Sequence, residues 1–434
     1  MQHMIDRATA PATRPLADVH FDFPEPITLS NGIELWVIGN GEDDINRLSI
    51  YMGGGAIQEE KPMQALLAGM QCTEGNKNMD AQHIAEAMDY YGSWKSAQNY
   101  DFNTQISLSS LNRNFTHTAR ILLDCIDSPT YPEKECRLFQ QRLASNIETA
   151  RQRVQYLAAE RMKQLYYGAG HPMARTITPE GVMSITTADL HQFHGTYYNH
   201  NNCRLVLAGR VTYKEIKTVD DTFGHWHKPG IKVDENLIAP EPSPTMLSVI
   251  DKKGSMQSAV AITIQAIPRR HPDYFKLRLT TTALGGYFGS RLNKDIREEK
   301  GYTYGIQAFL AGRANDSYIS ITTQCNGRYT MQVIDEVKKE MHHLATQPMP
   351  QAELDTVKQY MLSELVKTLD TPFSQASYVA SCFTYGIYPG YFNDQVREIS
   401  AMTTADVMAT AQKYYDPAKM RIVIAGDNNI IKNN

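Results

Sequence analysis

The chain repeats itself at one fixed spacing, and this duplication limits the folds that are open to it. The segment TTADLHQFHGTYYNHNNCRLVLAG at 186–209 aligns without gaps to TTADVMATAQKYYDPAKMRIVIAG at 403–426. Thr187 matches Thr404, so the copies lie 217 residues apart in a chain of 434 residues. A match of this length indicates two homologous halves, each of which repeats the same structural unit.

Each copy predicts the same local structure. Thr-Thr-Ala-Asp is typical of a capped helix start, Tyr-Tyr and a polar turn follow, and the apolar run before the final glycine is typical of a buried strand. Elsewhere, predicted strands and helices alternate in short groups instead of regular βαβ units. We therefore expect an α+β fold of two homologous domains, each an antiparallel-rich mixed sheet packed with helices.

The expected elements follow from apolar periodicity and from turn residues. In the first half they are a hairpin at 27–39, a strand from 47 to 51, helices at 63–70 and 83–91, a strand at 99–110, a helix at 114–126 and a long helix at 133–167, broken near 151–155. In the second half they are strands at 247–251 and 259–266, helices at 274–284 and 290–300, strands at 302–309 and 317–324, and helices at 331–346 and 351–368.

Domain boundaries are predicted from composition. Prolines at 240, 242 and 244 lie in a stretch that suits neither a helix nor a central strand, and this stretch is expected to be an extended linker. The predicted organisation is an N-terminal extension at 1–23, a first domain at 24–227, a linker at 228–246 and a second domain at 247–434.

Composition excludes several kinds of partner. The formal charge of −4, with 42% hydrophobic and 21% charged residues, indicates neither nucleic-acid binding nor attraction to an anionic membrane. The N-terminal residues contain no apolar signal-like run, and no uncharged apolar stretch is long enough to cross a bilayer. The six cysteines form no C-x-x-C pair, as expected of buried thiols in a reducing compartment, and we predict a cytoplasmic protein.

Glycines, an arginine and a tyrosine gather at 284–305. The preceding helix is expected to stop at Gly285 and Gly286 because glycine adopts the left-handed conformation that commonly ends a helix. Gly301 is expected to end the second, short helix, and a run of aromatic and β-branched residues typical of a strand follows it. Arg297 is placed near the end of a short helix and Tyr304 on the strand that follows, where we expect the two side chains to converge.

The order of motifs resembles the M16 zinc peptidases, the family of pitrilysin, insulinase and the mitochondrial processing peptidase. In the first half the resemblance lies in Gly53-Gly-Gly, the helix to Met70, Thr73-Glu-Gly and the region Tyr91 to Phe102, and it is closed by the 185–209 segment. In the second half it lies in Leu284-Gly-Gly, Ser290-Arg-Leu, Arg297-Glu-Glu-Lys-Gly and Tyr304. It covers nearly the whole chain, from about residue 24 to 428.

Active members of that family carry an inverted zinc motif, H-x-x-E-H, which supplies two metal ligands and a general base. The resemblance places this motif on Ala65, Ala68 and Gly69, none of which binds a metal or moves a proton. The third ligand falls at about Asn146, with Glu148 two residues away in a shifted register. The chain itself is therefore expected to hold no zinc and to lack the metal-bound water on which catalysis depends.

Other candidate metal ligands are weak. His83 and Glu86, and likewise His191 and His194, are spaced three residues apart, but two ligands without a third are more typical of a polar helix face. The repeat partners of His191 and His194 are Met408 and Ala411. His225 and His227 adjoin the linker and are interpreted as incidental.

The resemblance gives Arg297 and Tyr304 a role in substrate and transition-state binding. In the family, peptide adds as a strand inside a chamber between two facing halves, and an arginine and a tyrosine of the second domain reach the scissile carbonyl. A guanidinium orients peptide carbonyls, and a phenol donates to the oxyanion of a tetrahedral intermediate. The alternative is that Arg297 makes a surface ion pair and Tyr304 is a packed strand residue.

The resemblance therefore implies the non-catalytic subunit of a heterodimeric zinc peptidase. This chain, inactive alone, supplies Arg297 and Tyr304, and a homologous M16 subunit with an intact H-x-x-E-H supplies zinc and base for the cleavage of peptides. Two alternatives remain open. One is a purely structural relative, similar to the core subunits of respiratory complexes, and the other is a homodimer that binds peptides without proteolysis.

Overall fold

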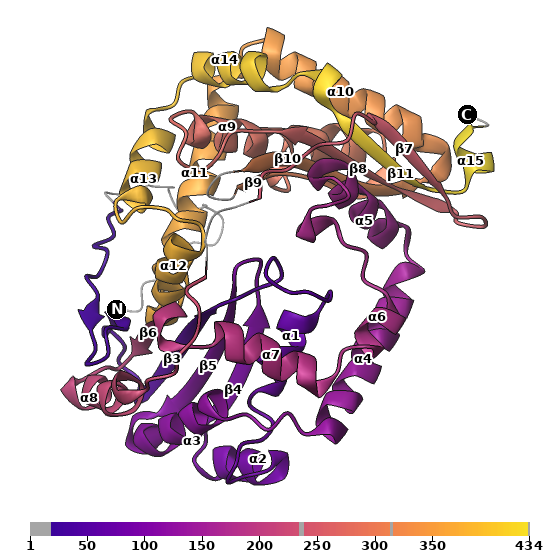
Figure 1. The fold of residues 1–434 in the computed structure, drawn as a ribbon. Coiled ribbons are helices and arrows are strands. Elements are labelled where there is room, and N and C mark those ends of the chain that lie inside the picture. The colour runs from indigo at the N-terminus through magenta and orange to yellow at the C-terminus, as the bar shows by residue number, and fades with distance from the viewer. Residues whose placement is uncertain (1–18, 234–237, 313–315, 433–434) are drawn as a thin grey trace, which may run out of the picture.

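The computed structural model describes residues 19–233, 238–312 and 316–432, and its two β-sheets face each other across the molecule (Figure 1). The first sheet has the order β1-β2-β6-β3-β5-β4 and the second the order β7-β11-β8-β10-β9. The strands are β1 (Ile27–Thr28), β2 (Glu34–Ile38), β3 (Ile45–Gly53), β4 (Trp94–Asn99), β5 (Asn103–Leu111), β6 (Cys203–Gly209), β7 (Leu247–Asp251), β8 (Gln257–Gln265), β9 (Thr303–Gly312), β10 (Ser317–Asn326) and β11 (Arg421–Gly426).

One parallel pair occurs in each sheet, β2 with β6 and β7 with β11, and the other pairings are antiparallel. The helices are α1 (Gln64–Gln71), α2 (Ala81–Tyr90), α3 (Phe115–Asp127), α4 (Glu133–Arg151), α5 (Val154–Tyr167), α6 (Pro179–Met183), α7 (Thr187–Tyr197), α8 (Tyr213–Thr222), α9 (Tyr274–Thr281), α10 (Thr330–Thr346), α11 (Gln351–Lys367), α12 (Pro372–Thr384), α13 (Tyr391–Ala401), α14 (Thr404–Tyr414) and α15 (Asn428–Lys432). The predicted α+β class with two antiparallel-rich mixed sheets is confirmed.

The duplicated segments adopt matching structures. Helices α7 and α14 begin and end at equivalent residues, and each starts with a capping box, Thr186 with Asp189 and Thr403 with Asp406. Strands β6 and β11 follow at the same spacing and lie inside their sheets, between a parallel and an antiparallel neighbour. The sequence repeat is therefore a repeat of structure.

Two local expectations are corrected. The strand predicted at 99–110 is present as β5, which begins only at Asn103, but the preceding strand β4, which pairs with it in a hairpin, was not predicted. Strand β4, with the sequence WKSAQN, lies at the sheet edge and has no apolar alternation to reveal it. The helix end at Gly285 and Gly286 is not left-handed, since neither glycine has a positive φ, and the chain passes through a π-helical turn at Thr282–Gly286. The predicted break in the long helix is present between α4 and α5.

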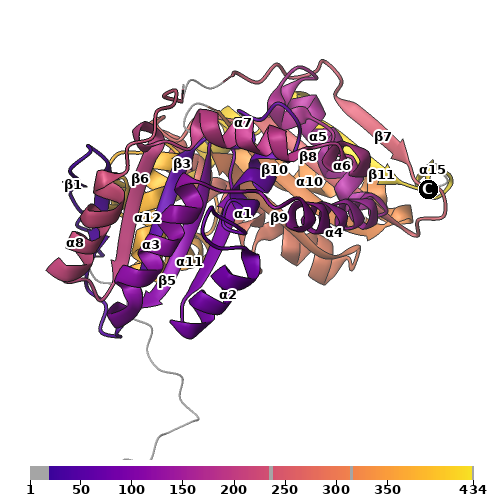
Figure 2. The same cartoon turned by 60° about the horizontal axis from the view of Figure 1, so that its bottom comes forward.

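One helix of each half packs on the sheet of the other half. Helix α5 lies against β8 and β11 of the second sheet, and α12, its counterpart at the repeat spacing, lies against β2 and β6 of the first. The apolar face of α5, with Val154, Ala158, Met162 and Leu165, meets Ala259, Ala261, Val423 and Ala425. Figure 2 shows α2 and α3 in front of the first sheet and α12 behind it. Each sheet is thus covered on its inner face by a borrowed helix.

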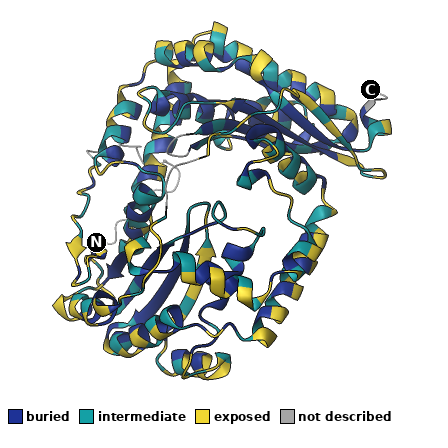
Figure 3. Cartoon of the chain, in the orientation of Figure 1, coloured by how far each residue is buried: buried dark blue, intermediate teal, exposed yellow. Residues whose placement is uncertain are grey.

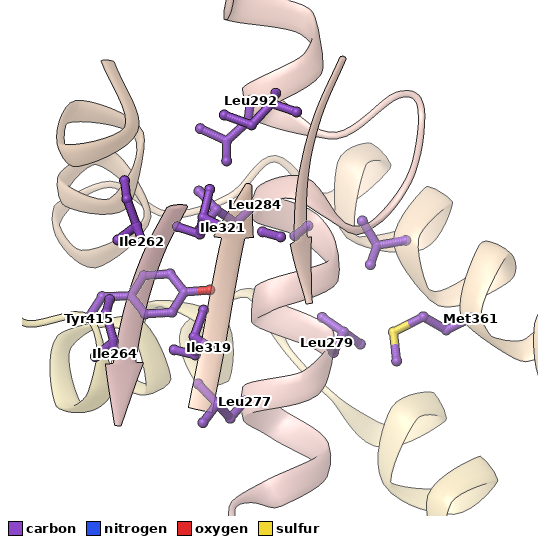
Figure 4. Packing of buried hydrophobic residues seen from close by; sticks show 14 of the residues in the cluster. Ile262, Ile264, Leu277, Leu279, Leu284, Leu292, Ile319, Ile321, Met361 and Tyr415 are labelled. Atoms are coloured by element: carbon purple, nitrogen blue, oxygen red, sulfur yellow. The ribbon is translucent and has the colours of Figure 1, made fainter. Parts of the chain in front are cut away.

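Burial follows this layered arrangement. The inner strands of both sheets are mostly buried, and exposed residues lie on the outward turns of the helices, on edge strands such as β4 and β7, and in loops (Figure 3). In the second half, Leu277, Leu279 and Leu284 pack against Ile262, Ile319 and Ile321 of the sheet (Figure 4). The same apolar cluster continues through α12 to Trp36 and Val206 of the first sheet, so it spans both halves, and the first half has a second core of its own.

The domain boundaries stay predictions, and most of the predicted N-terminal extension lies outside the described residues. Its residue Phe21 is buried, and its backbone N–H donates to the Asn393 side chain. The described part of the linker contains no helix or strand, and its residues Glu241 and Ser243 donate backbone N–H groups to the end of α5. None of the described helices combines the length and apolar character needed to span a bilayer.

Candidate functional site

Helix α1 carries the positions where the resemblance places the zinc motif. Ala65 and Ala68 are fully buried in the core of the first half, together with Ile147 of α4. A side chain at Gly69 has no room, because a Cβ there would lie 2.4 Å from the Thr104 methyl carbon. The three positions therefore contribute packing and carry no metal-binding atoms in their side chains.

The buried carboxylate nearest in sequence to these positions is Glu59, which caps α1. Its two oxygens accept hydrogen bonds from the backbone N–H groups of Met63 and Ala65, at 3.0 and 3.2 Å. Burial raises the pKa of Glu59 to about 7, although these hydrogen bonds favour the charged form. Because both oxygens are engaged at the helix start, Glu59 serves the fold of α1.

The position predicted for the third ligand also lacks a metal-site environment. Asn146 and Glu148 are both exposed on α4, and the buried residue between them is Ile147. The structure therefore brings Ile147, and not Asn146, into the apolar core that contains Ala65 and Ala68.

The histidines have other roles. His83 is exposed and contacts Asp80, which caps α2. His194 is buried, its Nε2 lies 2.7 Å from the Ile126 carbonyl oxygen, and burial lowers its pKa to about 3, so the ring is neutral. His191 is exposed, and its ring meets Tyr131 edge-on. Within the described ranges no three His, Cys, Asp or Glu side chains are placed to hold a metal together, and the absence of zinc from this chain stays a prediction.

Arg297 and Tyr304 line the same cavity, of about 910 Å³, on the inner side of the second sheet. The cavity is bounded by α5, by strands β8, β9 and β10, and by the two π-helical segments, Thr282–Gly286 and Asn293–Glu299. The guanidinium carbon of Arg297 lies 4.2 Å from the centroid of the Phe288 ring. The Tyr304 side chain is 91% exposed. The side chains of Arg297 and Tyr304, which we expected to converge, therefore lie in the wall of one cavity.

Neither alternative role describes these two residues. In the part of the chain that the structure describes, Arg297 has no ion-pair partner, and its neighbour Asp295 is paired with Lys300 at 2.5 Å. Tyr304 is not packed, because a bulge in the β9–β10 pairing lies beside it. The hydroxyls of Thr303 and Thr323 both donate to the Gly305 carbonyl and hold this bulge.

Two residues for which the sequence predicted no part in the site, Asn293 and Gly285, set the position of Arg297 relative to Tyr304. The Asn293 amide donates to the Ile306 carbonyl at 3.0 Å, which ties the π-helical segment to β9. A Cβ at Gly285 would lie 2.6 Å from the Ala308 Cβ, so this glycine lets the turn pack directly on β9. A buried asparagine reveals its partners only in three dimensions. The sequence predicted that Gly285 ends a helix in the left-handed conformation, whereas its role is to allow close packing on β9.

The fold and the cavity together define a class of protein: a duplicated α+β chain with Arg297 and Tyr304 on a cavity of the second half and no metal-binding side chains at Ala65, Ala68 and Gly69 of the first. Residues 184–361 match the family profile described as "Peptidase M16 inactive domain". The chain is 21% identical over 355 residues to the "Uncharacterized zinc protease YmxG" of Bacillus subtilis, covering 81% of this chain and 85% of the relative. It is 22% identical over 366 residues to the "Non-peptidase homolog YmxG" of Helicobacter pylori, covering 82% and 83%.

Solved structures show the same fold. An M16 inactive domain protein from Pseudomonas fluorescens has a TM-score of 0.85 at 21% identity, covering 93% of this chain and 98% of that one. A chain of complex III2 from Candida albicans has a TM-score of 0.73 at 15% identity, covering 94% and 99%. The profile match and these similarities relate the chain to the M16 peptidases, and Ala65, Ala68 and Gly69 stand where the resemblance places the zinc motif.

Proposed function

We propose that this chain is the non-catalytic subunit of a heterodimeric M16 zinc peptidase. The observation that carries the proposal is the contrast between the two halves. The second half keeps Arg297 and Tyr304 on an open cavity, whereas the first half has replaced every ligand position of α1 by a buried alanine or a glycine with no room for a side chain. A chain with these features contributes substrate binding and needs a partner for zinc and base.

The chemistry of the cavity suits this role. Strand β9 is the last strand of its sheet, and no further strand pairs with its outer edge in the described residues, although the Asn293 amide takes the backbone groups of Ile306; the rest of this edge suits pairing with an extended peptide. Arg297 orients a peptide carbonyl, and Tyr304 donates a proton in a hydrogen bond to the oxyanion that forms at the scissile carbon. A zinc ion held by the partner would lower the pKa of a bound water toward neutrality and would so supply the nucleophile.

The test is co-expression with a homologous M16 chain that carries an intact H-x-x-E-H. Zinc-dependent cleavage of peptides is expected from the mixture and from neither chain alone. In the complex, Arg297→Ala and Tyr304→Phe each lower kcat, by about 10²-fold or more if they stabilise the oxyanion. Tyr90→Phe, a change at an 84% exposed tyrosine on α2, is the matched control and leaves kcat unchanged. Full activity in both site variants, or one zinc per isolated chain, would contradict the proposal.

The alternatives make different predictions in the same experiment. A purely structural relative joins a complex without cleavage, and a peptide-binding homodimer binds peptides without any partner. We propose the cytoplasm as the location, with support from six buried cysteines that are all free thiols.

A further inference from the structure

We propose that the cavity beside β9 recognises a carboxylate next to a bulky apolar side chain in its peptide ligand. The inference deepens the proposed function and rests on it only in taking peptide as the occupant of the cavity. The proposed function concerns only the peptide backbone, and the present inference adds which side chains or chain end of the peptide the cavity prefers.

The wall of the cavity carries a single positive charge among the described residues. Arg297 is the one charged side chain among the described residues that line the cavity, and no carboxylate lies among them. The guanidinium carbon lies 4.2 Å from the centroid of the Phe288 ring, a cation–π contact that needs none of the guanidinium N–H groups as hydrogen-bond donors. Such an arrangement presents a planar fork of donors, and the fork matches a carboxylate bidentately.

The cavity is wide enough for a large apolar group and has apolar surface to cover it. Small residues from facing elements line it, among them Ala158 and Ala159 of α5 and Ala261 of β8. Two aromatic side chains at the cavity, Phe288 and Phe309, are 67% and 48% exposed, which is unusual for phenylalanine in a folded chain. Small side chains leave the volume for a large apolar group, and the exposed rings provide apolar surface to cover it. At about 910 Å³ the cavity has room for several peptide residues.

A carboxylate of this kind has two sources in a peptide. It is either the free carboxyl terminus after a bulky apolar last residue, or an Asp or Glu side chain beside such a residue. Both present the same two oxygens to Arg297, so the experiment has one arm for each source.

The test measures fluorescence anisotropy of labelled peptides on the isolated full-length chain. Four peptides of equal length are compared: one ending in a free-acid phenylalanine, its amide, an amidated peptide with an internal Asp-Phe, and the free acid with alanine in place of phenylalanine. The first or the third is expected to bind at least about tenfold more tightly than the neutral amide, since hydrogen bonds to charged groups are the strong ones. Alanine in place of phenylalanine loses a similar factor.

Matched variants separate recognition from general charge. Arg297→Gln abolishes the preference for the acid, and Arg297→Lys restores it only in part because it lacks the planar fork. Lys294→Gln, an exposed change in the same π-helical segment away from the cavity, leaves the preference intact. Ala159→Leu narrows the cavity and weakens the phenylalanine peptides, whereas Ala409→Leu on the exposed face of α14 does not.

The outcomes are decisive. Equal binding of acid and amide, an unchanged preference in Arg297→Gln, or the same loss in Lys294→Gln overturns the inference. Selective binding without partner-dependent cleavage supports the inference and contradicts only the proposed function. Partner-dependent cleavage that ignores the carboxylate contradicts only the inference.

Discussion

A single methyl group fills the space that a side chain at position 69 of α1 would need. The Thr104 methyl occupies the space beside Gly69, while the Thr104 hydroxyl donates to the Gly54 carbonyl at 3.1 Å. A histidine at position 69 has no place unless Thr104 moves. Restoring a histidine at position 69 would therefore also require a change at Thr104 of the neighbouring strand.

We predict that Gly69→Ala lowers the free energy of unfolding by about 1–3 kcal/mol, because overpacking outweighs the better helix propensity of alanine. Adding Thr104→Ser removes the clashing methyl, keeps the hydroxyl and recovers most of the loss. Gly195→Ala on α7, where a Cβ meets no other atom within 4 Å, is the control and raises stability by about 0.5–1 kcal/mol. Urea denaturation measures all three, and an equal effect at both glycines would refute the packing argument.

Among the elements, α5 and α12 decide how the halves are joined. Apolar periodicity and the break near residue 153 predict α5 correctly as a helix. The same periodicity does not name the sheet that its apolar face covers, because alanine- and valine-rich strand faces occur in both halves. The Ala259 and Ala261 side of β8 fits α5 because small side chains let a helix approach closely.

Met162→Ala on α5 is expected to destabilise the chain by about 2–5 kcal/mol, since it leaves a cavity between the helix and the second sheet. Met331→Ala on α10, where the side chain is 42% exposed, is the matched control and changes stability little. Thermal or urea unfolding of both variants is the measurement. A loss at Met162 no larger than at Met331 would mean that α5 does not stabilise the second sheet.

Because of this exchange, the largest apolar cluster of the molecule reaches from the second half into the first, beside a separate core within the first half. The apolar cluster of the second half includes Trp36 and Val206 of the first sheet, and Trp36 contacts Phe383 of α12 with ring centroids 4.8 Å apart. Two halves joined in this way are expected to unfold together, although the duplication predicts two similar units.

Trp36 contacts α12 of the second half, so the unfolding experiment uses a Trp36→Phe background, in which the fluorescence of Trp94 and Trp226 reports the first half, whereas far-ultraviolet circular dichroism reports both halves. Leu344→Ala, at a buried position of α10, is expected to shift both transitions equally by about 2–5 kcal/mol. The exposed Leu138→Ala on α4 shifts neither. A fluorescence midpoint that stays in place in Leu344→Ala would show that the halves unfold independently.

The sequence by itself determined the duplication, the capped helices and buried strands of each copy, the α+β class and the absence of metal-binding side chains at Ala65, Ala68 and Gly69. These follow from local patterns and residue chemistry, which act over a few neighbouring residues. Only the tertiary structure decided that α5 and α12 each pack on the sheet of the other half and that β4 forms a hairpin with β5. It also decided that Arg297 and Tyr304 line one cavity, with Asn293 and Gly285 fixing the segment between them. Those features depend on packing between residues far apart in the chain, and a single sequence records such partners only indirectly.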